Sequence, residues 1–263
     1  MPGFVDCHDH LWQSLIRGCG ADYGLTGWLE ECVFAVARAG LSSDDVFSAV
    51  KLSSIGLIET GVTTTLDWSH AFNDDFVDAN LQALLDSGLR FGYGYYCQNN
   101  PSNFMKANEI KNKIDYDLFA SMHICGHPAH EYVDELVDLV SVIEKLDLSL
   151  DIHLLESPDQ IAQKPFEALQ SAGAITNRLV ADHVVHLTLD QIQSLGLASA
   201  RITHNPLSNM RLGSGVAKLK EMNDAGIKIG LGLDGGTNDF PDFFSSMRAA
   251  VGLQRARAES VNI

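Results

Sequence analysis

Eight short apolar segments that alternate with helical segments constrain the fold of this 263-residue chain more than any other feature. The expected strands are rich in β-branched or apolar residues and span 4–10, 63–68, 90–96, 118–125, 148–154, 179–185, 200–206 and 228–234. Expected helices lie between or after them at 42–60, 76–87, 129–146, 158–172, 215–225 and 243–259. Several of these helices end at a glycine just before the next strand, as helix-to-strand loops commonly do.

Strands that alternate with helices predict a parallel sheet covered by helices. Eight such units in about 230 residues fit a closed (β/α)8 TIM-type barrel better than an open sheet. Because such barrels commonly occupy about 250 residues as one unit, we expect residues 1–263 to form a single domain. The polar segment 98–116, after the third expected strand, is expected to be a long loop.

Charge and composition exclude several classes of function. The formal net charge of −16 would repel a phosphate backbone, so nucleic acid is not an expected partner. No apolar run is long enough to cross a membrane, and the N-terminus lacks the pattern of a secretory signal. The cysteines are scattered, with no Cys-x-x-Cys pair: Cys7, Cys19, Cys32, Cys97 and Cys125. They predict a reduced, cytoplasmic chain with neither a disulfide nor a thiolate zinc site.

The segment His8-Asp9-His10 lies at the carboxyl end of the first expected strand. Side chains alternate along a strand, so His8 and His10 share one face while Asp9 points to the other. Barrel enzymes place their active sites at this end of the strands, and two imidazoles on one face form a suitable metal-binding pair. Two unrelated strand histidines remain the alternative at this point.

Other ionisable residues close further expected strands. His153 and Asp234 end the fifth and eighth, and His183 lies late in the sixth. Each alone is explained as well by a hydrogen-bonded core histidine or a helix-capping aspartate. Together they would cost desolvation free energy at matched barrel positions unless one shared metal ion compensates them. Glu156 follows the fifth strand and is either a proton carrier facing the site or a first-turn helix residue.

These residues belong to motifs that run in order along the chain: 2–10, 12–13, 17–18, 61–70, 153–156, 183–188, 204–209 and 230–235. In these motifs the chain resembles the amidohydrolase superfamily, in the branch of cytosine/guanine-type deaminases and triazine chlorohydrolases. The resemblance covers essentially the whole sequence. It implies a (β/α)8 barrel that carries a metal-dependent hydrolase site.

The resemblance also implies roles for individual residues. The implied ligands of one divalent metal ion, zinc or iron, are His8, His10, His153 and Asp234. Glu156 and His183 are implied to be catalytic, and Asp234 would also accept a proton from the attacking water. Two-metal members carry a bridging lysine on the fourth strand, which is missing from residues 118–125. The expectation is therefore a single ion and not a dihydroorotase- or hydantoinase-like enzyme.

The expected reaction is hydrolytic attack on an sp² carbon that bears a nitrogen or halide leaving group. An aminated heterocycle (a pyrimidine, purine, pterin or triazine) is the leading small-molecule substrate class. The candidate substrate-binding residues are Trp12, Gln13, Trp68, His70, His204 and Asn205. Core packing remains an alternative for the two tryptophans, as does turn formation for Asn205. The segment 127–131, His-Pro-Ala-His-Glu, has no zincin spacing and is expected to be a solvated loop entering a helix.

Two alternatives to a deaminase stay open: a triazine-type chlorohydrolase or alkylamine-releasing hydrolase, and a catalytically impaired fragment that only binds metal or ligand. The sequence departs from the family in lacking the accessory β-sandwich domain and the tail beyond the eighth barrel helix. The expectation is therefore a truncated barrel with exposed apolar surface, for which self-association into a homo-oligomer is left open.

Overall fold

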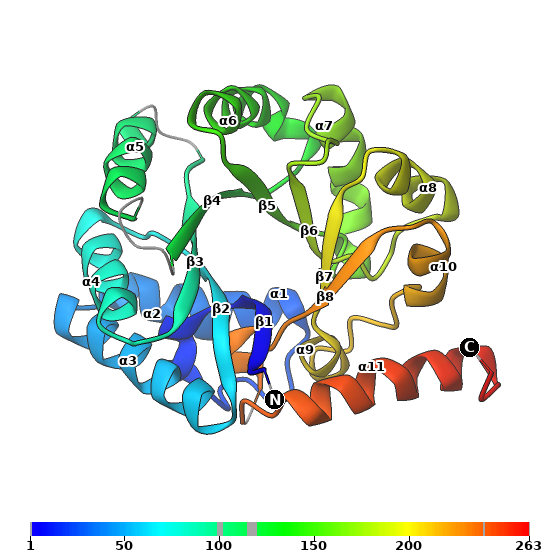
Figure 1. Cartoon of the computed structure of the whole chain (residues 1–263), viewed down its shortest axis with the longest axis horizontal. Coiled ribbons are helices and arrows are strands. Elements are labelled where there is room, and N and C mark those ends of the chain that lie inside the picture. Colours follow the sequence, from blue (N-terminus) through cyan, green and yellow to red (C-terminus); the bar gives the residue numbers. More distant parts are fainter. Residues whose placement is uncertain (1, 99–101, 115–119, 239, 263) are drawn as a thin grey trace.

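Eight parallel strands form the centre of the computed structural model, which describes residues 2–98, 102–114, 120–238 and 240–262 (Figure 1). The strands pair in the order of the sequence. They are β1 Phe4–Asp9, β2 Val62–Ser69, β3 Arg90–Tyr96, β4 Ala120–Gly126, β5 Ser149–Leu154, β6 Leu179–His183, β7 Arg201–His204 and β8 Lys228–Leu231. The predicted (β/α)8 barrel is confirmed, with all eight strands at their expected places.

The last strand returns to the first and closes the barrel. The backbone N–H groups of Leu233 and Asp234 both donate to the carbonyl of His8, at 3.1 and 3.0 Å. The Asp6 carboxylate accepts a further bond from the N–H of Leu233 at 3.0 Å. β8 itself ends at Leu231, so the prediction that Asp234 closes this strand is wrong. Asp234 lies in the following loop with a φ of +63°, a conformation that ends the strand before it.

Helices surround the barrel on its outer side (Figure 1). The longer ones are α3 Ser43–Glu59, α4 Asp74–Leu85, α5 Ser102–Ile114, α6 Val133–Leu146, α7 Pro165–Ser171, α8 Leu189–Leu197, α10 Leu219–Asp224 and α11 Phe243–Ala258. The start of α3 shows why the sequence places a helix there. The Ser42 hydroxyl accepts from the N–H of Asp45, and the Asp45 carboxylate accepts from the N–H of Ser42. This reciprocal capping box satisfies two N–H groups that a helix start leaves free.

Several elements differ from the expectation: the expected helix 215–225 is shortened to α10, and α8 lies where no helix was expected. The expected helix 158–172 is divided into η4 Pro158–Gln163 and α7 because Lys164 adopts a positive φ of 49°. The expected loop 98–116 contains α5, so this prediction is wrong within the described part of the segment. Ala107, Ile110 and Ile114 are buried at spacings of three and four residues, which gives this otherwise polar helix one apolar face.

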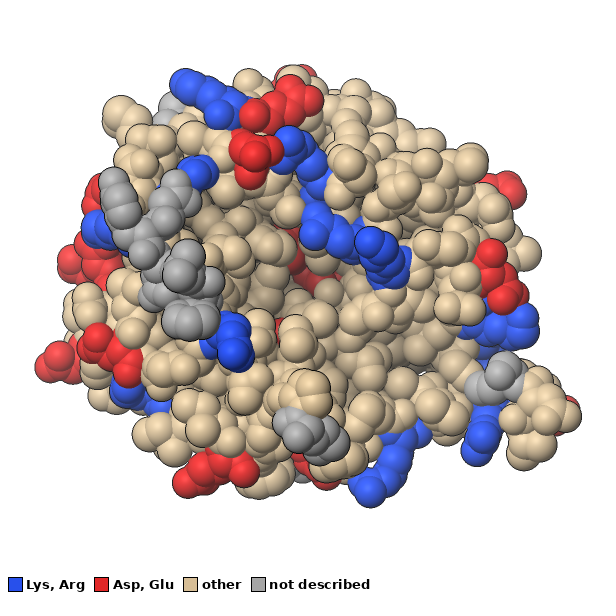
Figure 2. Space-filling view, in the orientation of Figure 1, with Lys and Arg blue, Asp and Glu red and all other residues tan. Residues whose placement is uncertain are grey.

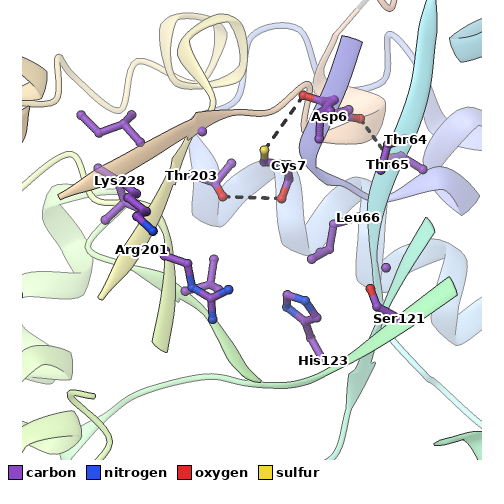
Figure 3. A pocket seen from close by; sticks show the side chains of 16 residues that line it. Asp6, Cys7, Thr64, Thr65, Leu66, Ser121, His123, Arg201, Thr203 and Lys228 are labelled. Carbon is purple, nitrogen blue, oxygen red and sulfur yellow. Dashed lines mark hydrogen bonds between the residues drawn. The ribbon is translucent and has the colours of Figure 1, made fainter. Parts of the chain in front are cut away.

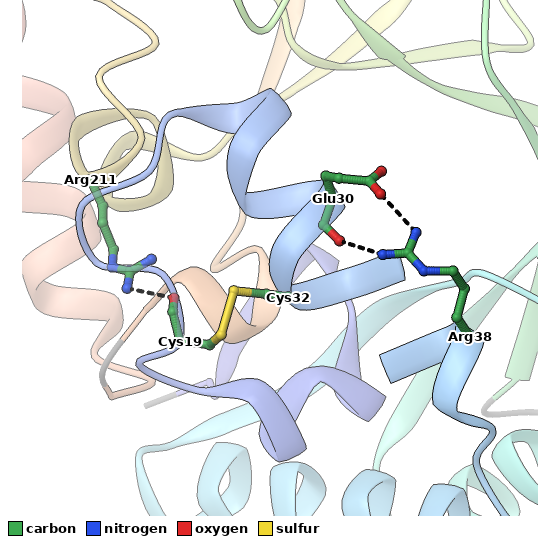
Figure 4. Close-up of a disulfide and its surroundings, with 5 residues drawn as sticks. All are labelled: Cys19, Glu30, Cys32, Arg38 and Arg211. Atoms are coloured by element: carbon green, nitrogen blue, oxygen red, sulfur yellow. Dashed lines mark hydrogen bonds and ion pairs between the residues drawn. A yellow bond between two sulfur atoms is a disulfide. The ribbon is translucent and has the colours of Figure 1, made fainter. Parts of the chain in front are cut away.

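The segment between β1 and α3 folds over the carboxyl end of the barrel. It contains η1 Leu11–Ile16, α1 Leu25–Trp28, the π-helical turn η2 Leu29–Val33 and α2 Phe34–Ala39. A disulfide between Cys19 and Cys32 joins two parts of this segment, with their Cα atoms 6.2 Å apart (Figure 4). The prediction of a chain without disulfides is therefore wrong. The pairing depends on the chain folding back on itself, which the spacing of the cysteines does not reveal.

The remaining short elements connect strands to helices: η3 His130–Tyr132, α9 Pro206–Arg211 and η5 Gly235–Thr237. No helix in the described part of the chain is both long and apolar enough to cross a bilayer.

Candidate active site

Three imidazole nitrogens converge at the carboxyl end of the barrel. The Nε2 atom of His153 lies 3.2 Å from Nε2 of His8 and 3.3 Å from Nε2 of His10. An Oδ1 atom of Asp234 completes the group, at 3.4 Å from Nε2 of His8 and 3.5 Å from Nε2 of His10. The four side chains come from β1, β5 and the loop after β8, so the barrel brings together residues from both ends of the sequence.

The outer nitrogens of the β1 histidines determine which nitrogen faces the centre. Nδ1 of His10 lies 2.7 Å from the carbonyl of Trp68, and Nδ1 of His8 lies 3.0 Å from Oδ2 of the fully buried Asp182. Both neighbours can accept a hydrogen bond from Nδ1, an arrangement that favours the tautomer in which the lone pair of Nε2 faces the centre. Metal-binding histidines are held in the same way by carbonyl and carboxylate partners.

The donor atoms lie close enough to share one ion. The four separations of 3.2, 3.3, 3.4 and 3.5 Å are close to the roughly 3.3–3.4 Å expected between neighbouring ligand atoms of zinc at its usual bond lengths. His8, His10 and His153 form one compact group of candidate ligands, and Asp234 belongs with His8 and His183 to a second, overlapping group. Three imidazoles and one carboxylate are also a donor set that suits zinc or iron.

The charges of these four side chains also favour a bound cation. Burial lowers the pKa of His10 to about 4 and, together with His8 and His10, holds the pKa of His153 well below its usual value. These imidazoles are therefore neutral, as metal ligands must be. His8 differs: burial alone would lower its pKa, but the neighbouring Asp182 and Asp234 raise it well above the usual value. The carboxylates thus favour one positive charge at this point, which a bound cation supplies as well as a proton does.

Glu156, His183 and Asn209 form a second group beside the first. Nδ1 of His183 lies 3.4 Å from Oε1 of Glu156 and 3.9 Å from Oδ2 of Asp234. The amide of Asn209 lies 3.1 Å from Nδ1 of His183 and donates to Oε1 of Glu156 at 3.4 Å. Burial and the Asp234 carboxylate raise the pKa of Glu156 well above its usual value, which favours the protonated form of this side chain. Burial lowers the pKa of His183 to about 3, which keeps it neutral.

A pocket with a volume of about 80 Å³ opens onto both groups. Its floor carries the histidines, Glu156 and Asp234, and its walls come from the segment over the barrel end and from later loops. The wall residues are Gln13, Leu25, Trp28, Leu29, Phe34, His70, His127, Gln160, Leu212 and Thr237.

A wider space with a volume of about 470 Å³ adjoins the pocket, and we call it the aromatic annexe. It is lined by Phe34, Ala37, Arg38, Trp68, His70, Phe72, Tyr96 and His127. Phe34, His70 and His127 border both spaces, so the annexe is continuous with the pocket. Arg38 is held at its edge by an ion pair with Glu30 at 2.8 Å (Figure 4).

The six expected substrate-binding residues lie at different depths. Gln13 and His70 line the pocket, and Trp68 lines the annexe. Trp12 is fully buried behind the pocket, where its Nε1 donates to Nδ1 of His70 at 3.0 Å. His204 and Asn205 are fully buried beneath it, and the Asn205 amide lies 3.3 Å from Nδ1 of His183.

Three contributors were not among the predicted site residues, although His127 belongs to the segment expected to be a solvated loop. His127 borders the pocket, where its ring stacks on His153 at 5.6 Å between centroids. It follows the end of β4, so the same strand-end argument that selected His153 could have found it. Asp182 and Trp28 carried no such signal, because one lies within a buried strand and the other in the segment over the barrel.

The model of the amidohydrolase family matches residues 1–262. The chain belongs to this family. A 5'-deoxyadenosine deaminase of Methanothrix thermoacetophila is 30% identical over 266 residues, which cover 97% of this chain and 63% of that protein. This amidohydrolase therefore spans less than two thirds of the length of that curated relative.

Solved structures of similar fold agree with the branch expected from the motifs. A zinc-bound adenosine deaminase of Xanthomonas campestris has a TM-score of 0.89 at 25% identity, covering 99% of this chain and 62% of that one. A guanine deaminase of C. acetobutylicum with bound guanine has a TM-score of 0.90 at 20% identity, covering 100% and 68%. The second likeness concerns the fold alone. The expected membership of the amidohydrolases, among relatives named as deaminases, is confirmed.

Proposed function

We propose that residues 1–263 form the catalytic domain of a metal-dependent deaminase that hydrolyses the amino group from a purine ring. The observation that carries this proposal is the convergence of three imidazoles and one carboxylate beside the buried side chain of Glu156. Relatives named for the deamination of 5'-deoxyadenosine and of 5-methylthioadenosine support a purine nucleoside as substrate.

We assign the metal site to His8, His10, His153 and Asp234, with zinc as the preferred ion because of the donor set and the zinc-bound neighbour. When bound, the ion lowers the pKa of a water molecule from about 15.7 to about 7 and so supplies a nucleophile at neutral pH. Each β1 imidazole is held in place by its Nδ1 contact, with Trp68 and with Asp182 respectively.

The other side chains move protons and orient the reactants. The ionised Asp234 accepts the proton of the attacking water, and His183, 3.9 Å from its Oδ2, orients that water. The carboxylic acid of Glu156 donates its proton to the ring nitrogen next to the reacting carbon, and this removes electron density from that carbon. Asp234 then passes its proton to the amino group, and the C–N bond breaks to release ammonia. The new hydroxyl group gives its proton to Glu156 as the carbonyl forms, so both carboxyl groups return to their starting states.

The two connected spaces suit a substrate with two parts. The narrow pocket encloses a planar heterocycle above the catalytic groups, with Gln13 and His70 as its polar walls. The aromatic annexe then takes the sugar and its 5′ substituent. We propose Trp68 as a contact to this substituent, and Trp12, His204 and Asn205 as supports of the residues that touch the ring.

The test is release of ammonia from 5'-deoxyadenosine by the zinc-loaded protein, with guanine and a chlorinated triazine as competing substrates. We expect ammonia from the nucleoside, loss of that activity in Asp234→Asn, and full activity in Asp190→Asn, an exposed carboxylate on α8. Chloride release from the triazine without ammonia from the nucleoside would identify a chlorohydrolase instead. No turnover of any substrate, despite a full complement of zinc, would leave only a binding function.

The cytoplasmic location expected from the sequence stays a prediction. In a reducing cytosol the Cys19–Cys32 bond would be open in most molecules, because disulfides persist mainly in oxidising compartments. Cell fractionation, with thiols trapped at lysis, measures the location and the state of this pair together.

A further inference from the structure

The barrel contains a second cavity, with a volume of about 320 Å³, at the end opposite the candidate active site. Its lining comes from the first halves of the strands, among them Val5, Thr64, Ser121, Arg201 and Lys228. Barrels usually fill this level with layers of bulky branched side chains. Here the strands present small residues such as Gly92, Ser121 and Gly230, which leave the interior open.

Arg201 is the most unusual group in this cavity. It is the first residue of β7, and its Nη2 donates to the hydroxyl of Ser149 at 2.8 Å. Its Nε is buried and has no hydrogen-bond partner. Among the described residues, no carboxylate lies within ion-pair distance of its guanidinium. A partly buried cation without a counterion is costly, and a bound anion would remove that cost.

His123 faces the same space from β4. Figure 3 shows the imidazole of His123 and the guanidinium of Arg201 pointing into the cavity from different sides. Nδ1 of His123 lies 3.2 Å from Oδ2 of the buried Asp151, so the negative charge of this aspartate already has a partner. Lys228 adds a second positive charge at the exposed edge of the cavity. Figure 2 shows a hollow near the centre of the molecule, with Lys and Arg side chains along one side of it and acidic side chains deeper inside.

The walls restrict the ligand further. Leu66, Val180, Ile202 and Ile229 make one part of the remaining lining apolar, and the buried Asp6, Thr65 and Thr203 make another part polar. Such walls would make the desolvation of a doubly charged phosphate expensive, whereas a single carboxylate can pair with one guanidinium through two parallel hydrogen bonds. Cys7 also borders the cavity, but burial raises the pKa of its thiol to about 11, so it offers no thiolate for covalent chemistry.

We propose that this cavity is a binding site for a small monocarboxylate with a compact apolar body, held by Arg201. The carboxylate pairs with the free edge of the guanidinium, and the apolar body packs against the aliphatic walls. The site lies at the other end of the barrel from the catalytic groups and is independent of the proposed deaminase activity.

The probe is 3-methylbutanoate, titrated into the zinc-loaded protein and followed by calorimetry and by the NMR signal of the Arg201 Nε–H group. That signal is assigned by its loss in Arg201→Gln. We expect a saturable shift of this signal and at least about tenfold weaker binding of the neutral 3-methylbutanamide, because a hydrogen bond to a charged group is lost. Arg201→Gln should weaken binding of the acid by about tenfold or more.

Two further variants keep the test decisive. Arg178→Gln removes an equal charge at the same end of the barrel, outside the cavity lining, and should leave the affinity unchanged. Ser121→Leu fills the cavity from an exposed position and should abolish binding even if Arg201→Gln fails to fold. Equal binding of acid and amide, equal losses in Arg178→Gln and Arg201→Gln, or unchanged binding in Ser121→Leu would each overturn the proposal. So would loss of binding in Asp234→Asn, which would place the acid at the metal.

Discussion

Replacement of Glu156 by glutamine separates proton transfer from metal binding. The side chain is only 4% exposed, and its Oε1 lies 3.4 Å from both Nδ1 of His183 and the amide of Asn209. Glutamine keeps the size of the side chain and one oxygen for Asn209 but has no acidic proton to donate. Because the group is buried, solvent water has little access to take over its role.

The expected loss follows from the role that is removed. General acid–base catalysis typically contributes 10²–10⁴-fold, so we expect kcat to fall by about that factor, equivalent to roughly 3–5 kcal/mol of activation free energy. Zinc content should stay unchanged, because no atom of Glu156 belongs to the converging donor group. The matched control is Glu167→Gln on α7, the same substitution at an exposed residue, which should keep full activity.

The assay combines initial rates of ammonia release with the zinc content of the same preparation. Loss of zinc in proportion to loss of rate, with unchanged turnover per bound ion, would show that Glu156 supports the metal and not the proton transfer. An unchanged rate at full zinc content would remove Glu156 from the mechanism altogether.

Four further outcomes are expected. Elemental analysis of protein purified without added metal should find about one divalent ion per chain, and two ions would contradict the single-ion site. Burial raises the pKa of Asp67 to about 7, above the ordinary 3.8 of the unfolded chain. The folded chain therefore binds a proton that the unfolded chain releases, and stability should fall as pH rises from about 4 to about 7. In Asp67→Asn the free energy of unfolding should fall less over this pH range, by at most about 4 kcal/mol. If urea titrations gave the same pH dependence of unfolding free energy for the variant and the unchanged protein, the assignment to Asp67 would be refuted. Alkylation of the unfolded, unreduced protein should label three of the five cysteines, and labelling of all five would show that Cys19 and Cys32 are not joined. Phe72→Ala, which changes a residue that lines the annexe but not the narrow pocket, should raise KM for a nucleoside by roughly tenfold through lost apolar contact but change KM for the free base little. Equal changes for both substrates would argue against the annexe as the sugar site.

Much of the barrel could be predicted because its signals are local. Each strand is a short run of β-branched and apolar residues, and several helices end at a glycine, as α3 does at Gly61 with a φ of +88°. The donor residues could be predicted for a related reason. Equivalent ends of parallel strands meet at one end of a barrel, so a polar residue at the end of β1 and another at the end of β5 must lie close together.

The remaining features depend on contacts that no local pattern shows. The polar faces of α5 hid its single apolar face, and the Cys19–Cys32 pair forms only once the segment over the barrel has folded. Asp182 contacts His8 from within β6. No sequence pattern distinguishes a buried aspartate that positions a metal ligand from one that only stabilises the fold. Asp234 lies beyond the end of its strand and adopts a positive φ. Because residues other than glycine also adopt positive φ in this chain, the residue type did not reveal this position.

The closure of the barrel between β1 and the segment after β8 affects how the protein unfolds. His8 belongs to the first strand and Asp234 follows the last, and their backbones are joined directly at this seam. An ion held by these two side chains would therefore cross-link the first and last strands of the sheet. This cross-link would close a loop that contains nearly the whole chain. Metal affinity would then enter the folding free energy directly, since a ligand that binds only the closed barrel stabilises it by mass action. A chelator should first speed up hydrogen exchange of the backbone amides in β1 and β8, the two strands at this seam. The amides of β3 and β4, away from the seam, should stay protected.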